Sequence, residues 1–127
     1  MSSTGPEFND DYKYRNFRMA VQGLASDVGT GTCSSNAVTI NDLCGLITTE
    51  ALSTAAAAEQ DITLTNSKVA AGDLVFVTSG YGTSTTGTPI VNANVSAGSV
   101  VITIKNVHAS EALNGTVKIG FMVVKAL

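Results

Sequence analysis

The sequence is poor in the residues from which catalytic and metal-binding sites are usually built. It contains no tryptophan, two prolines, two cysteines and one histidine, and charged residues make up 13% of its 127 residues. The usual charged share is about a quarter. Low charge does not indicate disorder here, because 44% of the residues are hydrophobic and the net charge is −3. We therefore expect one folded domain that buries roughly two thirds of the surface of its unfolded chain.

Serine, threonine and glycine supply much of what the sequence does contain. Serine and threonine together number 28, and glycine numbers 12. Hydroxyl and amide groups therefore form most of the polar surface, as is typical of extracellular all-β proteins. No signal-peptide core is present, because the first twenty residues carry charged side chains throughout, and no stretch reaches the length of a membrane span. We expect no membrane partner, synthesis in a host cytoplasm, and release by lysis or a dedicated route. A virus particle meets these conditions.

The cysteines and the histidine predict neither a disulfide framework nor a zinc site. Cys33 and Cys44 are too few for a framework, and His108 is the only further soft ligand. We expect both thiols to be reduced, as is usual in a reducing compartment. A disulfide between them is the alternative. No cofactor and no metal are expected, and His108 is interpreted as a structural residue of a turn.

No motif in the sequence predicts catalysis. Nucleophilic catalysis needs a nucleophile with a base within reach, and the sequence has neither a Gly-x-Ser-x-Gly elbow nor a phosphate-binding glycine loop. Paired carboxylates for glycoside cleavage would have to come from acidic residues that nothing in the sequence brings together: Asp42, Glu50, Glu59, Asp61 and Asp73. We predict that the protein is not an enzyme. Nucleic acid is not an expected partner either, because an acidic chain lacks the basic field of a nucleic-acid binder.

Alternating apolar residues predict β-strands over most of the chain. The strands are expected at residues 37–40, 45–52, 62–65, 73–79, 90–95, 99–105 and 117–124. Turn-forming residues separate them, so we predict an all-β fold: an antiparallel, jelly-roll-like β-sandwich of about seven strands. The alternation places Leu74 and Phe76 on one face. Within residues 49–59 the alanines favour helix locally, but we assign the first half to strand because no helical apolar stripe is present.

The N-terminal part of the chain has a different composition. Residues 7–18 hold four of the seven aromatic residues and three of the seven basic ones. We therefore divide the chain into an extended N-terminal arm, residues 1–30, and a β-sandwich domain, residues 31–127. Aromatic and arginine side chains are those that interfaces use most. The arm is predicted to dock on a partner through Phe8, Tyr12, Lys13, Tyr14, Arg15, Phe17 and Arg18.

Several predicted strands are apolar on both faces. Val101, Met122 and Val124 would point away from a single core, and Val75 and Val77 would add to the same outer surface. Scattered surface valines are normal in folded proteins. We favour the alternative, a subunit interface formed by Val101, Met122 and Val124.

The loop GYGTSTTGTP, residues 80–89, has the composition of a sugar-binding loop. Tyr81 offers a flat ring for stacking, and Thr83 and Ser84 offer hydroxyl groups beside it. Loops of this composition are also plain connections between strands. The loop is therefore interpreted either as a site for a host-surface glycan or as a connection without a ligand.

From Cys44 to Ala126 the sequence resembles a known group of virion proteins. The most recognisable pieces are ITTEAL, ITLTNSKV, GSVVITIKN at residues 98–106, ALNGT at residues 112–116, and IGFMVV. They are similar to small β-sandwich modules of tailed bacteriophages, found as capsid decoration (cement) proteins and as distal domains of tail fibres and tailspikes. These motifs are structural, so the resemblance implies a fold and a virion context rather than a chemistry.

The resemblance implies a homotrimer on the outer capsid surface of a virion, with the major capsid protein as partner and head stabilisation as function. A small separate chain favours this role, because fibre tips usually end much longer chains. The alternative is a receptor-binding distal domain of a tail fibre or tailspike, or a capsid-borne host-surface adhesin. For the arm, docking on the capsid competes with folding back over its own trimer.

Overall fold

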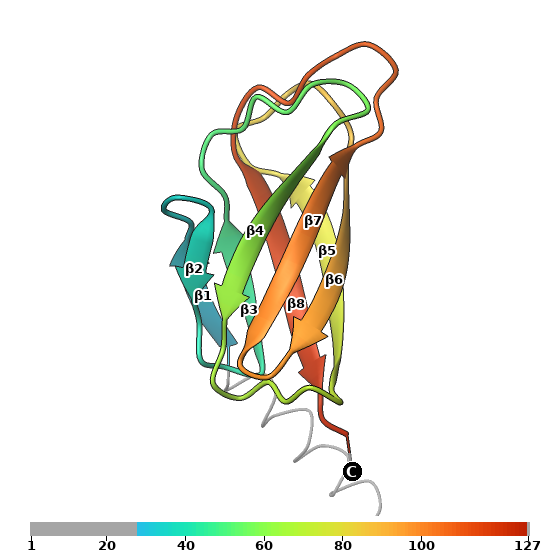
Figure 1. The fold of residues 1–127 in the computed structure, drawn as a ribbon. Helices are drawn as coiled ribbons and strands as arrows, with labels where there is room; N and C mark the ends of the chain where they lie inside the picture. The colour runs from blue at the N-terminus through green and yellow to red at the C-terminus, as the bar shows by residue number, and fades with distance from the viewer. Residues whose placement is uncertain (1–27, 127) are drawn as a thin grey trace, which may run out of the picture.

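The computed structural model describes residues 28–126, in which two β-sheets pack face to face (Figure 1). These residues form eight strands and no helix. The strands are β1 (Val28–Thr32), β2 (Ala37–Thr39), β3 (Cys44–Thr48), β4 (Glu59–Thr65), β5 (Leu74–Tyr81), β6 (Pro89–Ser96), β7 (Ser99–Asn106) and β8 (Val117–Val124). The predicted all-β sandwich is confirmed. The additional strand is β1, which begins within the last residues assigned to the arm.

The chain changes sheet at almost every connection. Sheet A contains β1, β3, β8 and β5 in that order, and sheet B contains β2, β4, β7 and β6. Among the connections between the eight described strands, only the hairpin between β6 and β7 stays within one sheet. Its turn at residues 97–98 includes Gly98 with a φ of 72°, a conformation that glycine adopts without strain.

Two of the six strand pairs are parallel, whereas alternation predicted an antiparallel sandwich. β1 pairs with β3 and β2 pairs with β4 in parallel, and the remaining pairs are antiparallel. Each strand reverses the direction of the one before it, and the first four strands alternate between the sheets. Strands that are neighbours within a sheet therefore lie two steps apart in the chain and point the same way.

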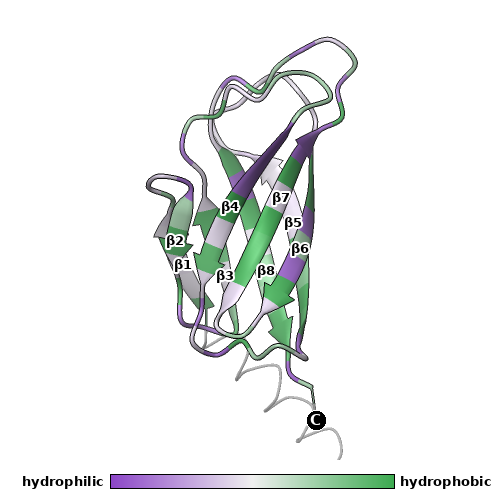
Figure 2. Cartoon of the chain, in the orientation of Figure 1, coloured by the Kyte–Doolittle hydropathy of each residue, from purple (hydrophilic) through white to green (hydrophobic). Residues whose placement is uncertain are grey.

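Alternate positions of both sheets fill the interior. Val100, Ile102 and Ile104 of β7 are completely buried, as are Val117 and Ile119 of β8. Figure 2 shows green, hydrophobic segments along these two strands. Each such side chain contributes roughly 1.5–3 kcal/mol when it is fully buried. The facing rows of the two central strands therefore hold the sheets together.

Strand β5 is turned opposite to the expected orientation. Val75 and Val77 pack against the core, whereas Leu74 and Phe76 are exposed. The expectation that Val75 and Val77 belong to the outer surface is therefore wrong. All four residues are apolar, so alternation alone does not distinguish the faces. Pairing with β8 does, because it sets Val77 beside the buried Phe121.

Strand β3 ends at Thr48, so the predicted continuation of the strand to residue 52 is wrong. Residues 49–58 form neither strand nor helix and cross from sheet A to sheet B. The backbone N–H of Leu52 donates to the carbonyl oxygen of Gly115 at 2.9 Å, and the Leu52 side chain is buried. The crossing is thus held by tertiary contacts that override local propensity.

Candidate functional site

The outer face of sheet A is an apolar surface to which all four strands contribute. The pairing register aligns Val28 of β1, Cys44 of β3, Met122 of β8 and Phe76 of β5 in one row across the sheet. Six large apolar side chains, three in this row and three next to it, are exposed on the same face. We call them the sheet A patch: Val28, Leu46, Leu74, Phe76, Met122 and Val124, each between 37% and 65% exposed.

A groove of about 390 Å³ runs through the sheet A patch. Leu46, Phe76 and Met122 are among the residues that line it, and Gly120 lies at its floor. The register places Gly120 between Leu46 and Thr78 on the outer face. A Cβ atom added to Gly120 would come within 3.2 Å of a Thr78 methyl carbon. The groove therefore exists because this position has no side chain.

The structure brings two of the three predicted interface residues together. Met122 and Val124 belong to the sheet A patch. Val101 lies on β7 in sheet B, and the core residues Val100 and Ile102 on either side of it point inward. Val101 therefore faces outward on the opposite side of the sandwich, so the predicted single surface of Val101, Met122 and Val124 is wrong.

The outer face of sheet B is polar. Its side chains come from the strand positions that alternate with the core: Glu59, Asp61, Thr63, Ile90, Asn92, Asn94, Val101, Thr103 and Lys105. Lys105 Nζ lies 3.5 Å from a Glu59 carboxylate oxygen, and Thr103 Oγ1 donates to Asp61 Oδ1 at 2.7 Å. Ile90 is the one large hydrophobic side chain that is exposed on this face among the described residues. The two outer faces thus differ in chemistry.

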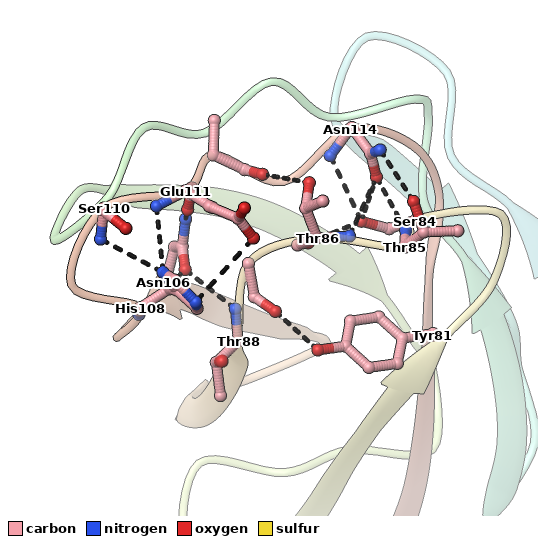
Figure 3. Close-up of polar contacts among 12 residues, drawn as sticks. Tyr81, Ser84, Thr85, Thr86, Thr88, Asn106, His108, Ser110, Glu111 and Asn114 are labelled. Atoms are coloured by element: carbon pink, nitrogen blue, oxygen red, sulfur yellow. Dashed lines mark hydrogen bonds and ion pairs between the residues drawn. The ribbon is translucent and has the colours of Figure 1, made fainter.

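The predicted sugar-binding loop lies at one end of the sandwich, beside the loop at residues 107–116 (Figure 3). Asn114 Oδ1 accepts the backbone N–H of Thr85 at 2.7 Å and of Thr86 at 3.2 Å. Ser84 is 3% exposed, and its Oγ donates to the Asn114 side chain or to the Thr86 carbonyl. The expectation that Ser84 offers its hydroxyl to a sugar is wrong, because buried hydroxyls pair internally.

Tyr81 and Thr83 remain accessible at this end. The Tyr81 hydroxyl donates to the Gly87 carbonyl (Figure 3), while 54% of the residue is exposed. Thr83 Oγ1 accepts the Thr116 backbone N–H at 2.9 Å. The Tyr81 ring is therefore anchored at its hydroxyl while about half of the residue is exposed, which is an arrangement that suits stacking.

The single histidine has the structural role expected of it. Its Nδ1 accepts the backbone N–H groups of Ser110 at 3.1 Å and of Glu111 at 2.9 Å. The His108 backbone N–H donates to Asn106 Oδ1 at 3.1 Å (Figure 3). His108 thus caps the turn in which it lies.

The two cysteines form no disulfide. Cys33 is buried in the core, and Cys44 lies on the outer face of sheet A. Burial, and then the nearby Glu50 carboxylate, raise the pKa of the Cys33 thiol. Cys33 is therefore a poor nucleophile at neutral pH.

The residues predicted for the docking arm lie outside the described residues. They are Phe8, Tyr12, Lys13, Tyr14, Arg15, Phe17 and Arg18. Within residues 28–126, no group of three or more His, Cys, Asp or Glu side chains could hold a metal ion. No helix in this part of the chain is long and apolar enough to cross a membrane.

Comparisons of the sequence with protein-family models and with characterised proteins, and of the fold with solved structures, find no match. The site is therefore defined by its geometry. Sequence reasoning found Met122 and Val124 but missed Val28, Leu46, Leu74 and Phe76. The apolar alternation in β5 was the signal for Leu74 and Phe76. Val75 and Val77, rather than these two residues, were assigned to the outer face.

Proposed function

We propose that this chain is a structural virion protein: a capsid decoration protein that binds as a homotrimer to the outer surface of a tailed-phage head. It contacts the major capsid protein and stabilises the head without catalysis. The observation that carries the proposal is the contrast between the two outer faces of the sandwich. One face presents six exposed apolar side chains, and the other is polar. Exposed apolar surface favours binding by burial.

The polar groups of the sandwich support the same function, because they are used to hold the loops. No buried side-chain nitrogen or oxygen atom of the described residues lacks a hydrogen-bond partner. Asn106 and Ser84 tie together the loops at one end. At the other end, the buried Asp73 carboxylate accepts hydrogen bonds from Lys125 Nζ and the Ala126 backbone. A scaffold fastened at both ends suits a clamp that resists internal pressure.

Quantitative mass spectrometry of purified particles tests the proposal. Particles of the phage that encodes the chain are expected to contain it in numbers of the same order as the major capsid protein. Purified protein is also expected to co-sediment with heads that lack it. A copy number far below that of the capsid subunits would contradict a decoration role and would favour a tail-tip position.

Recognition of a host-surface glycan is a second candidate function. The exposed and anchored Tyr81 ring favours it, and Thr83 is exposed two residues further along the same loop. Sugars stack on aromatic faces, so the ring rather than the hydroxyl is the part expected to bind. Tyr81→Ala is expected to abolish adsorption to host cells, whereas Tyr81→Phe keeps the face and retains adsorption. Unchanged adsorption of the alanine variant would remove this candidate.

A further inference from the structure

We infer that the outer face of sheet A is the surface through which one copy of this chain binds another. Leu74 and Phe76, which we call the β5 ridge, are seated in the groove over Gly120 of the next copy. The inference rests on the proposed homotrimer and names its contact surface. It assigns the contact to one face of the sandwich and leaves the polar face of sheet B outside it.

Charge favours a second copy as the occupant. A surface that meets its own copy brings equal charges together, and juxtaposed like charges destabilise an interface. Among the residues that the structure describes, the strand positions on the outer face of sheet A include a single charged residue, Lys118. It lies two positions before Gly120 and outside the sheet A patch. The patch itself is uncharged. The central part of an interface is depleted in charge in the same way.

The area of the face is that of a small interface. The four strands of sheet A hold 26 residues, and with strands about 4.8 Å apart and residues about 3.3 Å apart they cover roughly 400 Å². This is about half of the ~800 Å² per partner of a standard interface, before protruding side chains are counted. Exposed apolar patches of this size mark interaction sites.

The shape of the face determines how two copies meet. The β5 ridge stands at the edge of sheet A, and its Phe76 also forms one wall of the groove, which extends over β8 and β3. Phe76 is 59% exposed, and the groove volume of about 390 Å³ falls within the size range of protein pockets. A ridge that enters the groove of the next copy makes a head-to-tail contact. Contacts of this type close into a ring when the rotation between successive copies closes, as a trimer requires, and otherwise give an open filament.

Substitution of Phe76 tests the inference against a matched control. Phe76→Asp places a carboxylate on the ridge, and Ile90→Asp places one on the outer face of sheet B. Both positions are outward-facing, on edge strands, and more than half exposed. Phe76→Asp is expected to raise the dissociation constant at least about 30-fold, as a hot spot does, and to give a monomer in light scattering. Ile90→Asp is expected to retain the oligomer.

A second variant removes the groove without removing any apolar side chain. Gly120→Val fills the floor and is compatible with a strand, because β-branched residues favour strands. It is expected to abolish association while the far-UV circular dichroism of the wild-type chain is retained. Association that survives both Phe76→Asp and Gly120→Val would overturn the inference.

The remaining outcomes separate this inference from the proposed function. A wild-type chain that is monomeric at micromolar concentration overturns the inference, whether or not it binds heads. If deletion of residues 1–27 from such a monomer exposes the face to a hydrophobic dye, the occupant is the N-terminal segment. A Phe76→Asp variant that stays oligomeric but no longer binds heads identifies the face as the capsid contact, which overturns the inference and leaves the decoration role intact. Dissociation of Phe76→Asp but not of Ile90→Asp supports the inference, whatever head binding shows.

Discussion

Asn106 at the end of β7 is the side chain whose loss should most disturb the loop end of the sandwich. It is completely buried, and its amide group makes four hydrogen bonds. Nδ2 donates to the carbonyl oxygens of Thr54 at 3.1 Å and Glu111 at 2.8 Å, and Oδ1 accepts the N–H groups of Thr88 at 2.9 Å and His108 at 3.1 Å. These four partners belong to three different connections, so one side chain joins the crossing after β3, the loop after β5 and the loop after β7.

The magnitude follows from these four bonds. A typical intramolecular hydrogen bond contributes about 0.5–1.5 kcal/mol net, and a buried group left without a partner costs about 1–3 kcal/mol. Thr88 and Glu111 lie in exposed loops, where water can replace part of what is lost. We therefore expect Asn106→Ala to lower the free energy of unfolding by roughly 3 kcal/mol, which lowers Tm by on the order of 10–20 °C.

Urea unfolding followed by circular dichroism, together with a thermal scan, measures this change. The matched control is Asn94→Ala on the outer face of sheet B, where the side chain is exposed and the expected change is within about 0.5 kcal/mol. The variant Asn106→Asp keeps the shape and the acceptor but replaces the two donors by an oxygen that faces carbonyl groups, so it too should be destabilised. An Asn106→Ala variant within about 1 kcal/mol of the wild type would refute the role assigned to this network.

Three further predictions concern single groups. Hydrogen bonds from Lys125 and from two backbone amides lower the pKa of Asp73 to about 2, below the value of about 3.9 in the unfolded chain. The resulting stability is present above pH ~4 and lost as the pH falls toward 2, so urea midpoints of Asp73→Asn should vary less with pH in that window than those of the wild type. Ala57 has a φ of 63°, where a Cβ is strained by about 1 kcal/mol; Ala57→Gly should therefore raise Tm slightly, and a lower Tm would contradict this. Cys33 should react with a maleimide only after unfolding, as mass spectrometry with and without urea would show.

The strands that sequence alone predicts best are those with one apolar face. In β7 the fully buried Val100, Ile102 and Ile104 alternate with four side chains, of which three are polar: Ser99, Thr103 and Lys105. The period therefore identifies both the strand and its inner face. In β5 the run from Leu74 to Val77 is apolar at every position, and the period identifies the strand but not the face. The structure settles this by pairing β5 with β8, which is a contact between distant parts of the chain.

Local propensity fails where tertiary contacts outweigh it. The alanine-rich residues 49–58 favour helix, and the apolar residues before them favour a longer β3, but the segment adopts neither form. The Ala57 backbone N–H donates to the Asn106 carbonyl at 2.8 Å, and the Leu113 N–H donates to the Thr54 carbonyl at 2.9 Å. Partners more than forty residues away are not visible in a window of ten residues. The same reason makes the parallel pairing of β1 with β3 unpredictable from alternation.

The location of the candidate interface also depends on which sheet each strand belongs to, and the alternation of apolar residues does not reveal this. Alternation correctly predicts that Val101, Met122 and Val124 point outward, because each is next to core residues. A sandwich has two outer faces, however, and membership of a sheet decides on which of them an outward side chain lies. Val101 lies on β7 and Met122 on β8. These two strands follow one another in the chain but belong to different sheets. The long crossing at residues 107–116 separates them. A surface that contains Met122 therefore takes its other members from β8 itself and from β1, β3 and β5.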